Sequence, residues 1–211
     1  MPRVGLSREK LIASAMAVAD EQGLAAVSMH SLARSYGVAA PSMYKHVRNL
    51  EDLQQAIATE SLTLMEHSLR SSAGSLTSLA RAYRAFALDH PGLYESTALP
   101  HLFTNERALA ASNSIIAMIA SALPHTLLPD DVVNQVRIVR SALHGFVTLE
   151  RNGGFGTEAS LEKSFDELCA TLELVTTLAG VATRPKVPTA GDVPDQVGSG
   201  AQGPQQGMLQ L

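Results

Sequence analysis

Residues 37–53, GVAAPSMYKHVRNLEDL, decide the fold of this chain because they place chain breaks on both sides of a very short polar helix. Gly37 can end one helix, and Pro41 suits the first turn of the next because a proline there loses no helical hydrogen bond. Asn49 interrupts the chain again soon afterwards. A helix this short is not stable alone. We therefore expect neighbouring helices to brace it and to present it to a partner.

The arrangement predicted around this segment is a helix-turn-helix. The pattern indicates a first helix at about Met29–Tyr36, a turn at residues 37–39 and a second helix at about Ala40–His46. The apolar side chains expected to brace these helices are Leu32, Ala33, Val38 and Met43. The side chains left free to enter a DNA major groove are Ala40, Ser42, Lys45 and His46. Helix–Gly–helix corners are also common as purely structural features of all-α proteins, so the pattern alone leaves both interpretations open.

The charge distribution favours the nucleic-acid interpretation. Residues 1–50 contain six Lys and Arg side chains and three Asp and Glu side chains, an excess of three positive charges. Because the net charge of the whole chain is −4, residues 51–211 carry an excess of seven negative charges. A basic unit on an acidic body is typical of a protein that binds an anion at one end.

The rest of the chain predicts helices and no long strand. Good N-caps at Ser7, Ser28 and Asn49 precede apolar residues at helical spacing. The expected helices span about 7–23, 28–36, 49–70, 77–90, 105–123, 130–151 and 160–184. The predicted fold is all-α, with a three-helix helix-turn-helix head at residues 1–50 and a helical effector-binding and dimerisation domain at 51–183. Nine of the 28 residues from 184 to 211 are Pro or Gly, which predicts a disordered tail.

Composition excludes several classes of protein. One cysteine, Cys169, permits no internal disulfide and fits a reducing compartment. The first ten residues, MPRVGLSREK, contain no apolar core of a signal peptide, and the longest apolar run, SIIAMIASAL at residues 114–123, is too short to span a membrane. We therefore expect a cytoplasmic protein that does not contact a membrane.

The segment quoted first resembles the TetR family of bacterial transcriptional repressors. In that family a three-helix DNA-binding head ends in Gly-Val, then Tyr, then His-Phe or His-Val, and here Gly37-Val38, Tyr44 and His46-Val47 match. The resemblance covers about residues 7–58. It implies that the head binds double-stranded DNA.

The resemblance also implies roles for individual residues. Tyr44, His46 and the cap residue Ser28 correspond to phosphate contacts, and His30 can reach the edge of the groove. Ala40, Pro41 and Ser42 occupy the positions that face bases. The chain departs from the family at Leu50, where a lysine is usual, and Lys45 or Arg48 is expected to replace that phosphate contact.

The C-terminal part is similar to one TetR subfamily, named for a Trp-His-Gly motif. The stretches LARAYRAFALDHPGLYE, residues 79–95, and LHGFVTLERNGGF, residues 143–155, carry the similarity, with Leu143 in place of the Trp. The family fold implies a homodimer joined by the last two long helices of each subunit. Apolar residues of the last helix that step by four and three predict a seam at Leu161, Phe165, Leu168, Leu172 and Val175. Packing against the preceding helix of the same subunit would give the same pattern.

The helices of the body supply apolar walls with few polar groups, which suits a small organic effector. The residues predicted to contact it are Met65, Tyr83, Phe86, Asn113, Arg137 and His144. No two histidines of the body have metal-ligand spacing, and no catalytic residues or cofactor fingerprint are found, so the sequence predicts no metal, no cofactor and no enzyme.

The sequence therefore predicts a dimeric, ligand-responsive transcriptional regulator, a repressor that binds an inverted-repeat operator and is released by a small organic effector. The alternative is an all-α ligand-binding protein or enzyme whose N-terminal helix-turn-helix is only structural. An activator is a further alternative.

Overall fold

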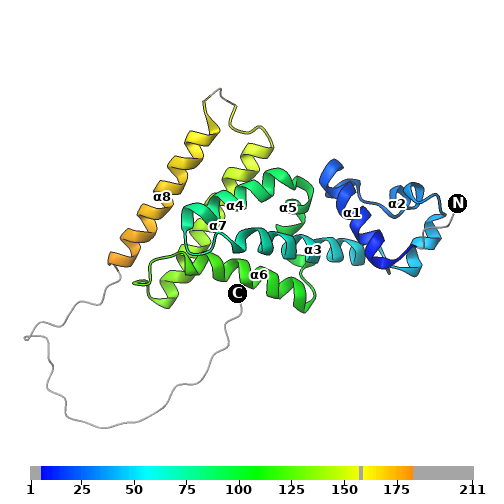
Figure 1. Ribbon diagram of the computed structural model, residues 1–211, viewed down its shortest axis with the longest axis horizontal. Coiled ribbons are helices and arrows are strands. Elements are labelled where there is room, and N and C mark those ends of the chain that lie inside the picture. Colours follow the sequence, from blue (N-terminus) through cyan, green and yellow to red (C-terminus); the bar gives the residue numbers. More distant parts are fainter. Residues whose placement is uncertain (1–5, 157–158, 183–211) are drawn as a thin grey trace, which may run out of the picture.

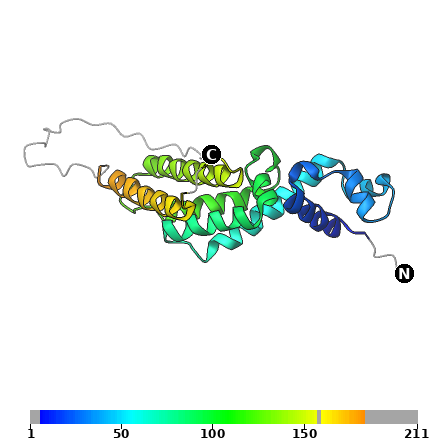
Figure 2. The same ribbon diagram turned by 90° about the horizontal axis from the view of Figure 1, so that it is seen from above.

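The computed structural model describes residues 6–156 and 159–182, and within these residues it contains helices and no strand. The predicted tail, residues 184–211, lies outside the described part of the chain. The molecule is elongated, with a small helical unit at one end and a larger helical body at the other (Figures 1 and 2). None of the described helices is long and apolar enough to cross a membrane.

The small unit, here called the head, comprises residues 6–47. It contains α1 (Arg8–Gln22), a 3₁₀ turn at Leu24–Ala26, α2 (Met29–Ser35) and a second 3₁₀ segment at Ala40–Lys45. Ser7 caps α1, since its side chain accepts a hydrogen bond from the backbone N–H of Lys10. Ser28 caps α2 in a reciprocal capping box with Ser31. Both caps agree with the prediction, and they fix where the two helices begin.

The second helix of the predicted helix-turn-helix is a 3₁₀ helix and not an α-helix. Its hydrogen bonds run over three residues, from Ser42 N–H to the Ala39 carbonyl at 2.8 Å and from His46 N–H to the Met43 carbonyl at 2.9 Å. The buried side chains of Leu32, Ala33 and Met43 brace it, as predicted.

Val38, the fourth predicted bracing residue, is exposed. It follows Gly37, whose positive φ of 64° turns the chain outward between the two helices. Val47 is buried instead and closes the edge of the head nearest α3, the helix that follows.

The long helix α3 (Leu50–Arg70) connects the head to the body (Figure 1). The body continues with α4 (Leu76–Asp89), α5 (Pro91–Thr97), a 3₁₀ turn at Pro100–Leu102, α6 (Glu106–Ser121), α7 (Pro129–Arg151) and α8 (Leu161–Ala182). The second half of α3 lies between α4 and α5 on one side and α6 on the other, and α7 crosses this group (Figure 1). The buried residues Ile57, Leu62 and Met65 of α3 belong to the common hydrophobic core.

A second contact joins the head to the body. Helix α5 packs against α1 so closely that a Cβ added to Gly92 would lie 1.7 Å from the Ala19 carbonyl oxygen. Nearby, the Nδ1 atom of His90 lies 2.8 Å from the Asp20 carboxylate. Helix α3 is therefore not the sole connection between the head and the body in the described part of the chain.

Helix α8 is held to the body by the half-buried guanidinium of Arg84. Arg84 of α4 makes two hydrogen bonds to the Glu150 carboxylate of α7, at 2.8 and 2.6 Å, and one to Glu162 of α8 at 2.6 Å. Its guanidinium carbon also lies 4.7 Å from the ring centre of Phe165. A paired charge at this position ties three helices together.

The predicted dimer seam requires a correction. Phe165 and Leu172 are 0% and 4% exposed within one protomer, so their side chains cannot contact a partner. They point inward together with Cys169 and Thr176. Of the other predicted seam residues, Leu161 and Leu168 are half-buried and Val175 is exposed. The α8 periodicity therefore describes mainly the intrachain packing that the sequence pattern allows as an alternative.

Candidate DNA-binding surface and effector pocket

The short 3₁₀ segment at residues 40–45 lies on the surface of the head, where it can be reached by a partner. Tyr44 is 54% exposed, and Lys45 and Pro41 are also exposed. Ala40, Ser42 and His46 are half-buried, with Met43 beneath them fully buried. The buried methionine therefore anchors the segment while the tyrosine and lysine face outward.

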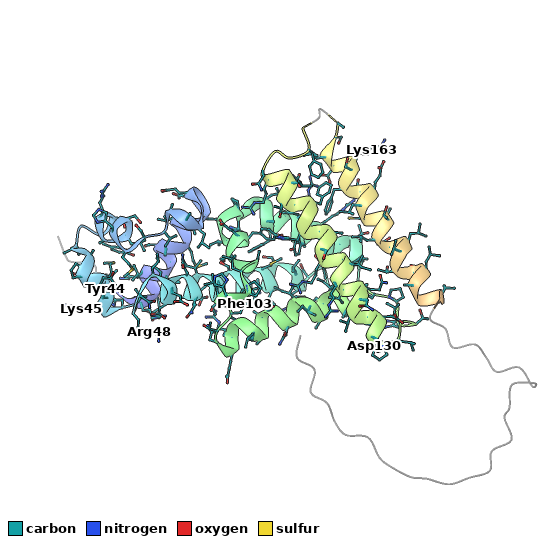
Figure 3. The ribbon with its side chains drawn as sticks, turned by 180° about the vertical axis from the view of Figure 1, so that it is seen from behind. Tyr44, Lys45, Arg48, Phe103, Asp130 and Lys163 are labelled. Carbon is teal, nitrogen blue, oxygen red and sulfur yellow. The ribbon has the colours of Figure 1, made fainter. Side chains whose placement is uncertain are left out.

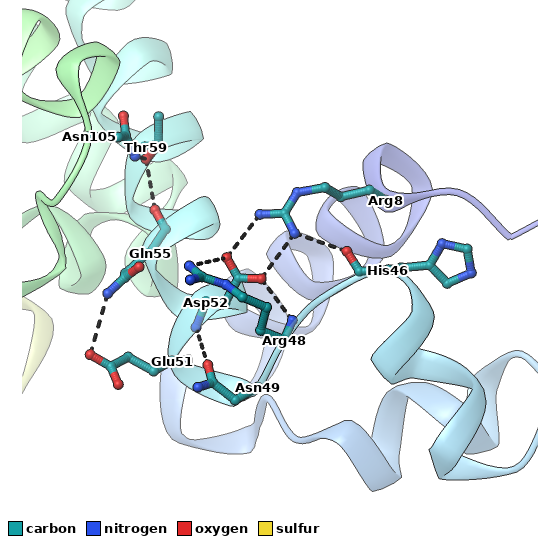
Figure 4. A network of polar contacts seen from close by, with 9 residues as sticks. All are labelled: Arg8, His46, Arg48, Asn49, Glu51, Asp52, Gln55, Thr59 and Asn105. Carbon is teal, nitrogen blue, oxygen red and sulfur yellow. Dashed lines mark hydrogen bonds and ion pairs between the residues drawn. The ribbon is translucent and has the colours of Figure 1, made fainter.

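One carboxylate, that of Asp52, holds this segment in place (Figure 4). It accepts hydrogen bonds from Arg8 Nη1 and Nη2 at 3.1 and 3.2 Å and from the backbone N–H of Arg48 at 2.9 Å. Arg8 Nη1 also donates to the His46 carbonyl at 2.9 Å. Asp52 itself is positioned by Asn49, whose side chain accepts from the Asp52 N–H at 2.8 Å and caps α3. The start of α1, the end of the 3₁₀ segment and the start of α3 meet at this carboxylate.

The environment of Asp52 favours its charged form. Its pKa is lowered to about 2, chiefly by the hydrogen bonds from Arg8 and further by the Arg48 backbone N–H. Asp52 lies in the first turn of α3, where a negative charge also complements the helix dipole. The sequence predicts that dipole effect but not the partner Arg8, which is 44 residues away in the chain.

Three of the predicted DNA-binding residues form one basic edge. Tyr44, Lys45 and Arg48 lie together at the end of the molecule opposite α8 (Figure 3). With His46 and Arg8 they line a shallow groove of about 350 Å³. The Arg48 side chain is 82% exposed and makes only a long ion pair, 3.4 Å, with Asp52. Its guanidinium is therefore accessible to an anion.

Two further predicted residues belong to the start of α2. The Ser28 hydroxyl is used inside the head, because it accepts from the Ser31 N–H at 3.0 Å and donates to the Ser31 hydroxyl at 2.9 Å. His30 is exposed, and its Nε2 lies 3.3 Å from Arg34, a basic residue that sequence reasoning missed. Arg34 lies in the last turn of α2, where a cation is favoured by the helix dipole. That position is the sequence signal by which Arg34 could have been included among the basic residues of the site.

The body contains two neighbouring pockets that meet at Arg137 and Arg140 of α7. The larger has a volume of about 530 Å³, lies between α6 and α7, and is mainly apolar. Its apolar lining includes Phe103, Leu109, Ile116, Val132 and Val136. The smaller, of about 250 Å³, is lined by the polar groups of Tyr83, Tyr94, Ser141 and His144 together with both arginines.

A chain of polar groups forms one wall of the smaller pocket. The hydroxyls of Tyr83 and Tyr94 are 2.9 Å apart, and the Tyr94 hydroxyl lies 2.6 Å from Nδ1 of His144. Burial raises the pKa of both phenols, so both remain neutral near pH 7. The guanidinium of Arg151 lies 5.3 Å from the ring centre of Tyr94.

The structure places the predicted effector contacts in two groups. Tyr83, Asn113, Arg137 and His144 line the pockets. Met65 and Phe86 line neither, because both are packed in the core and are 3% exposed.

Sequence reasoning missed Tyr94 and Arg140 in the pocket lining. Arg140 lies three residues after Arg137 and four before His144, so helical spacing alone could have found it. For Tyr94 no sequence signal exists, because its position depends on how α5 packs.

A helix-turn-helix with exposed cations, joined to an all-helical body that contains an apolar pocket, defines the class of helix-turn-helix DNA-binding regulators. This chain belongs to the TetR family of DNA-binding transcriptional regulators. Residues 11–57 match the family described as bacterial regulatory proteins, tetR family, and residues 76–172 match the tetracyclin repressor-like C-terminal domain.

Two curated relatives extend over most of the chain. The uncharacterized HTH-type transcriptional regulator Rv0681 of Mycobacterium tuberculosis is 30% identical, over 84% of this chain and 87% of its own length. The uncharacterized HTH-type transcriptional regulator YobS of Bacillus subtilis is 28% identical, over 77% of this chain and 88% of its own.

Solved structures share the fold at lower identity. A protein of unknown function from Rhodococcus sp. RHA1 is 22% identical with a TM-score of 0.68, covering 83% of this chain and 98% of that one. The structure of BioQ with its double-stranded DNA operator is 21% identical with a TM-score of 0.59, covering 81% of this chain and 99% of that one. A TetR variant from Acinetobacter baumannii AYE in complex with minocycline is 21% identical with a TM-score of 0.56, covering 82% of this chain and 99% of that one.

The geometry of Asp52 predicts a specific dependence of stability on pH. Because its folded pKa of about 2 lies below the usual 3.8, its contribution to stability is complete above about pH 4 and is lost as the pH falls through 2. Asp52→Asn should lower the free energy of unfolding by about 2 kcal/mol at pH 7, the value of hydrogen bonds to a charged group. Urea unfolding followed by circular dichroism at several pH values measures this, and the difference between the two proteins should shrink towards pH 2. A difference that stays constant over this range would contradict the assignment.

Proposed function

We propose that the protein is a dimeric repressor that binds an inverted-repeat operator through its head and is released by a small organic molecule bound in the body. The observation that carries the proposal is the Asp52 contact, which ties the chain just after the 3₁₀ segment to α1 and α3 while Tyr44, Lys45 and Arg48 remain exposed. Hydroxyl and cationic donors on one edge are suited to hydrogen bonds with phosphate oxygens. A short helical segment can place its first turn in a DNA major groove.

The likeness to operator-bound BioQ supports a DNA ligand, and the likeness to minocycline-bound TetR supports a small effector. At 21% identity these structures share the fold with this chain, so the roles of individual residues rest on the geometry described above. Proteins that read an inverted repeat are twofold symmetric, which requires a dimer.

Exposed apolar residues on α7 and α8 support a dimer face. Leu174, Leu178 and Val181 of α8 are each 57–59% exposed and are spaced by four and three residues, so they lie on one side of the helix. Ile138 and Leu149 lie on one exposed side of α7, three turns apart. The two helices pack together and share one face of the molecule (Figure 3). A second copy of the chain would bury this face, forming a four-helix contact.

Helix α5 supports a route from the pocket to the head. Its Tyr94 hydroxyl reaches the smaller pocket, while Gly92, two residues earlier, touches the Ala19 carbonyl of α1. A ligand that displaced Tyr94 would therefore also displace the surface against which α1 rests. An effector shifts the equilibrium by binding the two arrangements with different affinity. We infer that α5 and α3 together transmit this shift.

The first test is operator binding. We expect the protein to bind an inverted repeat in the DNA that flanks its gene, with log K falling against log salt at a slope of about −4, since Lys45 and Arg48 from two protomers give four phosphate contacts. Tyr44→Phe should weaken binding by about 1 kcal/mol on all DNA sequences alike. Tyr36→Phe is the control, because the Tyr36 hydroxyl donates inside the head to the Lys10 carbonyl at 2.9 Å. Fluorescence anisotropy with labelled operator DNA measures the salt dependence and the affinities of the two variants. An operator affinity that is independent of salt would refute the proposal.

The dimer face gives a second prediction. Leu178→Glu should leave the protomer folded, because Leu178 is already exposed, but should raise the dimer dissociation constant at least ~100-fold, because each protomer would bury an unpaired charge. Operator affinity should fall with it. Light scattering measures the mass, and Leu64→Glu on α3, also an exposed leucine, is the control that should remain dimeric. A dimeric Leu178→Glu protein would place the interface elsewhere.

The coupling route gives a third prediction. Gly92→Ala places a methyl group against the Ala19 carbonyl and must push α5 away from α1, with an overpacking cost of about 1–3 kcal/mol. Operator affinity without ligand should fall about 10-fold. Gly145→Ala on α7 is the matched control, since a Cβ added there meets nothing within 4 Å. Circular dichroism and light scattering first establish that Gly92→Ala is a folded dimer, and unchanged affinity in that protein would exclude α5 from the route.

A further inference from the structure

The pockets of the body carry an unbalanced positive charge. Arg137 and Arg140 are one turn apart on α7 and line both pockets. None of the side chains that line either pocket is an Asp or Glu. Two cations at the boundary between an apolar pocket and a polar one therefore have no anion beside them in the described part of the protomer.

These two arginines differ from the others in the described part of the chain. Arg8, Arg48, Arg70, Arg81, Arg84 and Arg107 each pair with a carboxylate. Arg34 makes a hydrogen bond to His30, and Arg151 donates to the Pro91 carbonyl at 2.5 Å. Among the described residues, Arg137 and Arg140 are the arginines whose side chains have neither a hydrogen bond nor an ion pair. Both side chains are exposed to solvent at the edge of the two pockets, and guanidinium groups without a protein partner there are available to a ligand.

The tyrosines of the smaller pocket do not supply the missing negative charge. Both phenols are neutral near pH 7, because burial raises pKa values that are ordinarily already well above 7, and the hydroxyls of Tyr83 and Tyr94 already contact each other and His144. They can orient a polar head group by hydrogen bonding, but they leave the charge of the arginines uncompensated.

We propose that this site binds an amphipathic organic carboxylate, whose apolar chain or ring fills the larger pocket and whose carboxylate lies between Arg137 and Arg140. The apolar lining from Phe103 to Val136 covers the hydrophobic part. The planar guanidinium forms paired hydrogen bonds with a planar carboxylate, and two exposed arginines one turn apart can both reach one carboxylate at the edge of the apolar pocket. Neutral molecules would leave both cations unpaired, and cationic ones would be repelled. The inference rests on the proposed function, which makes this site the effector site.

The test measures ligand binding directly, with the full-length protein and without DNA. Octanoate, decanoate, dodecanoate and 4-phenylbutyrate are compared by isothermal titration calorimetry, each with the alcohol and the amine of the same carbon skeleton. At least one carboxylate should bind ~10-fold or more tightly than its alcohol, and the amines should not bind. Alcohols that bind as tightly as every carboxylate would overturn the proposal.

Substitutions then locate the charge. Arg137→Gln and Arg140→Gln should each lower the affinity of the preferred carboxylate about 10-fold and leave that of the alcohol unchanged. Arg140→Glu should abolish the preference for the carboxylate, because the new carboxylate lies one helical turn from Arg137 and can pair with it. Arg70→Gln is the control, because Arg70 is exposed on α3, pairs with Glu66 and lines neither pocket. Equal carboxylate affinity in the wild-type protein and in both Gln variants would place the ligand elsewhere.

Operator release is measured separately, so that the two proposals can fail independently. A carboxylate that binds through Arg137 and Arg140 but leaves operator affinity unchanged would support the ligand class and contradict the effector role of the pocket. A protein that binds its operator but prefers no carboxylate over its alcohol would keep the regulatory function and overturn the ligand class.

Discussion

The position of the 3₁₀ segment at residues 40–45 depends on the carboxylate of Asp52. A 3₁₀ helix of six residues, Ala40–Lys45, cannot hold its own conformation, because its few hydrogen bonds do not offset the entropy lost in ordering it. Asp52 links the first residue of α1, the chain after the segment and the first turn of α3 through hydrogen bonds of about 3 Å. The buried Met43 fixes the segment from within, and Asp52 fixes its end. Without this contact the exposed donors would have no defined spacing.

The same contact links the head to the body, because Asp52 belongs to the helix that continues into the body core. A tilt of α3 would change the geometry at Asp52 and with it the direction of the 3₁₀ segment at residues 40–45. Helix α5 adds a second link at Gly92, where its backbone meets the Ala19 carbonyl of α1. These two contacts restrain the orientation of the head more strongly than one connection would, and the proposed coupling between pocket and head uses both.

Charge is arranged differently in the two parts of the molecule. In the body, the half-buried Arg84 lies between two carboxylates and serves to hold α8 in place. Arg137 and Arg140, on α7, line a cleft without any acidic residue. The paired guanidinium of Arg84 stabilises helix packing, and the unpaired, exposed guanidiniums of Arg137 and Arg140 are the groups proposed to bind a carboxylate.

The sequence by itself determined the local features of this protein. It predicted the all-helical class, the caps at Ser7, Ser28 and Asn49 and the helix-turn-helix, because caps, Gly and Pro positions and helical periodicity act over a few residues. It did not determine which face of α8 packs inward, since a stripe such as Phe165 and Leu172 satisfies an intrachain contact and a dimer seam equally well. Nor did it show that Met65 and Phe86 lie in the core while Tyr94 and Arg140 line the pockets. Only the tertiary structure decided these points, together with the pairing of Arg8 with Asp52, because they depend on residues distant in the chain that meet when the helices pack.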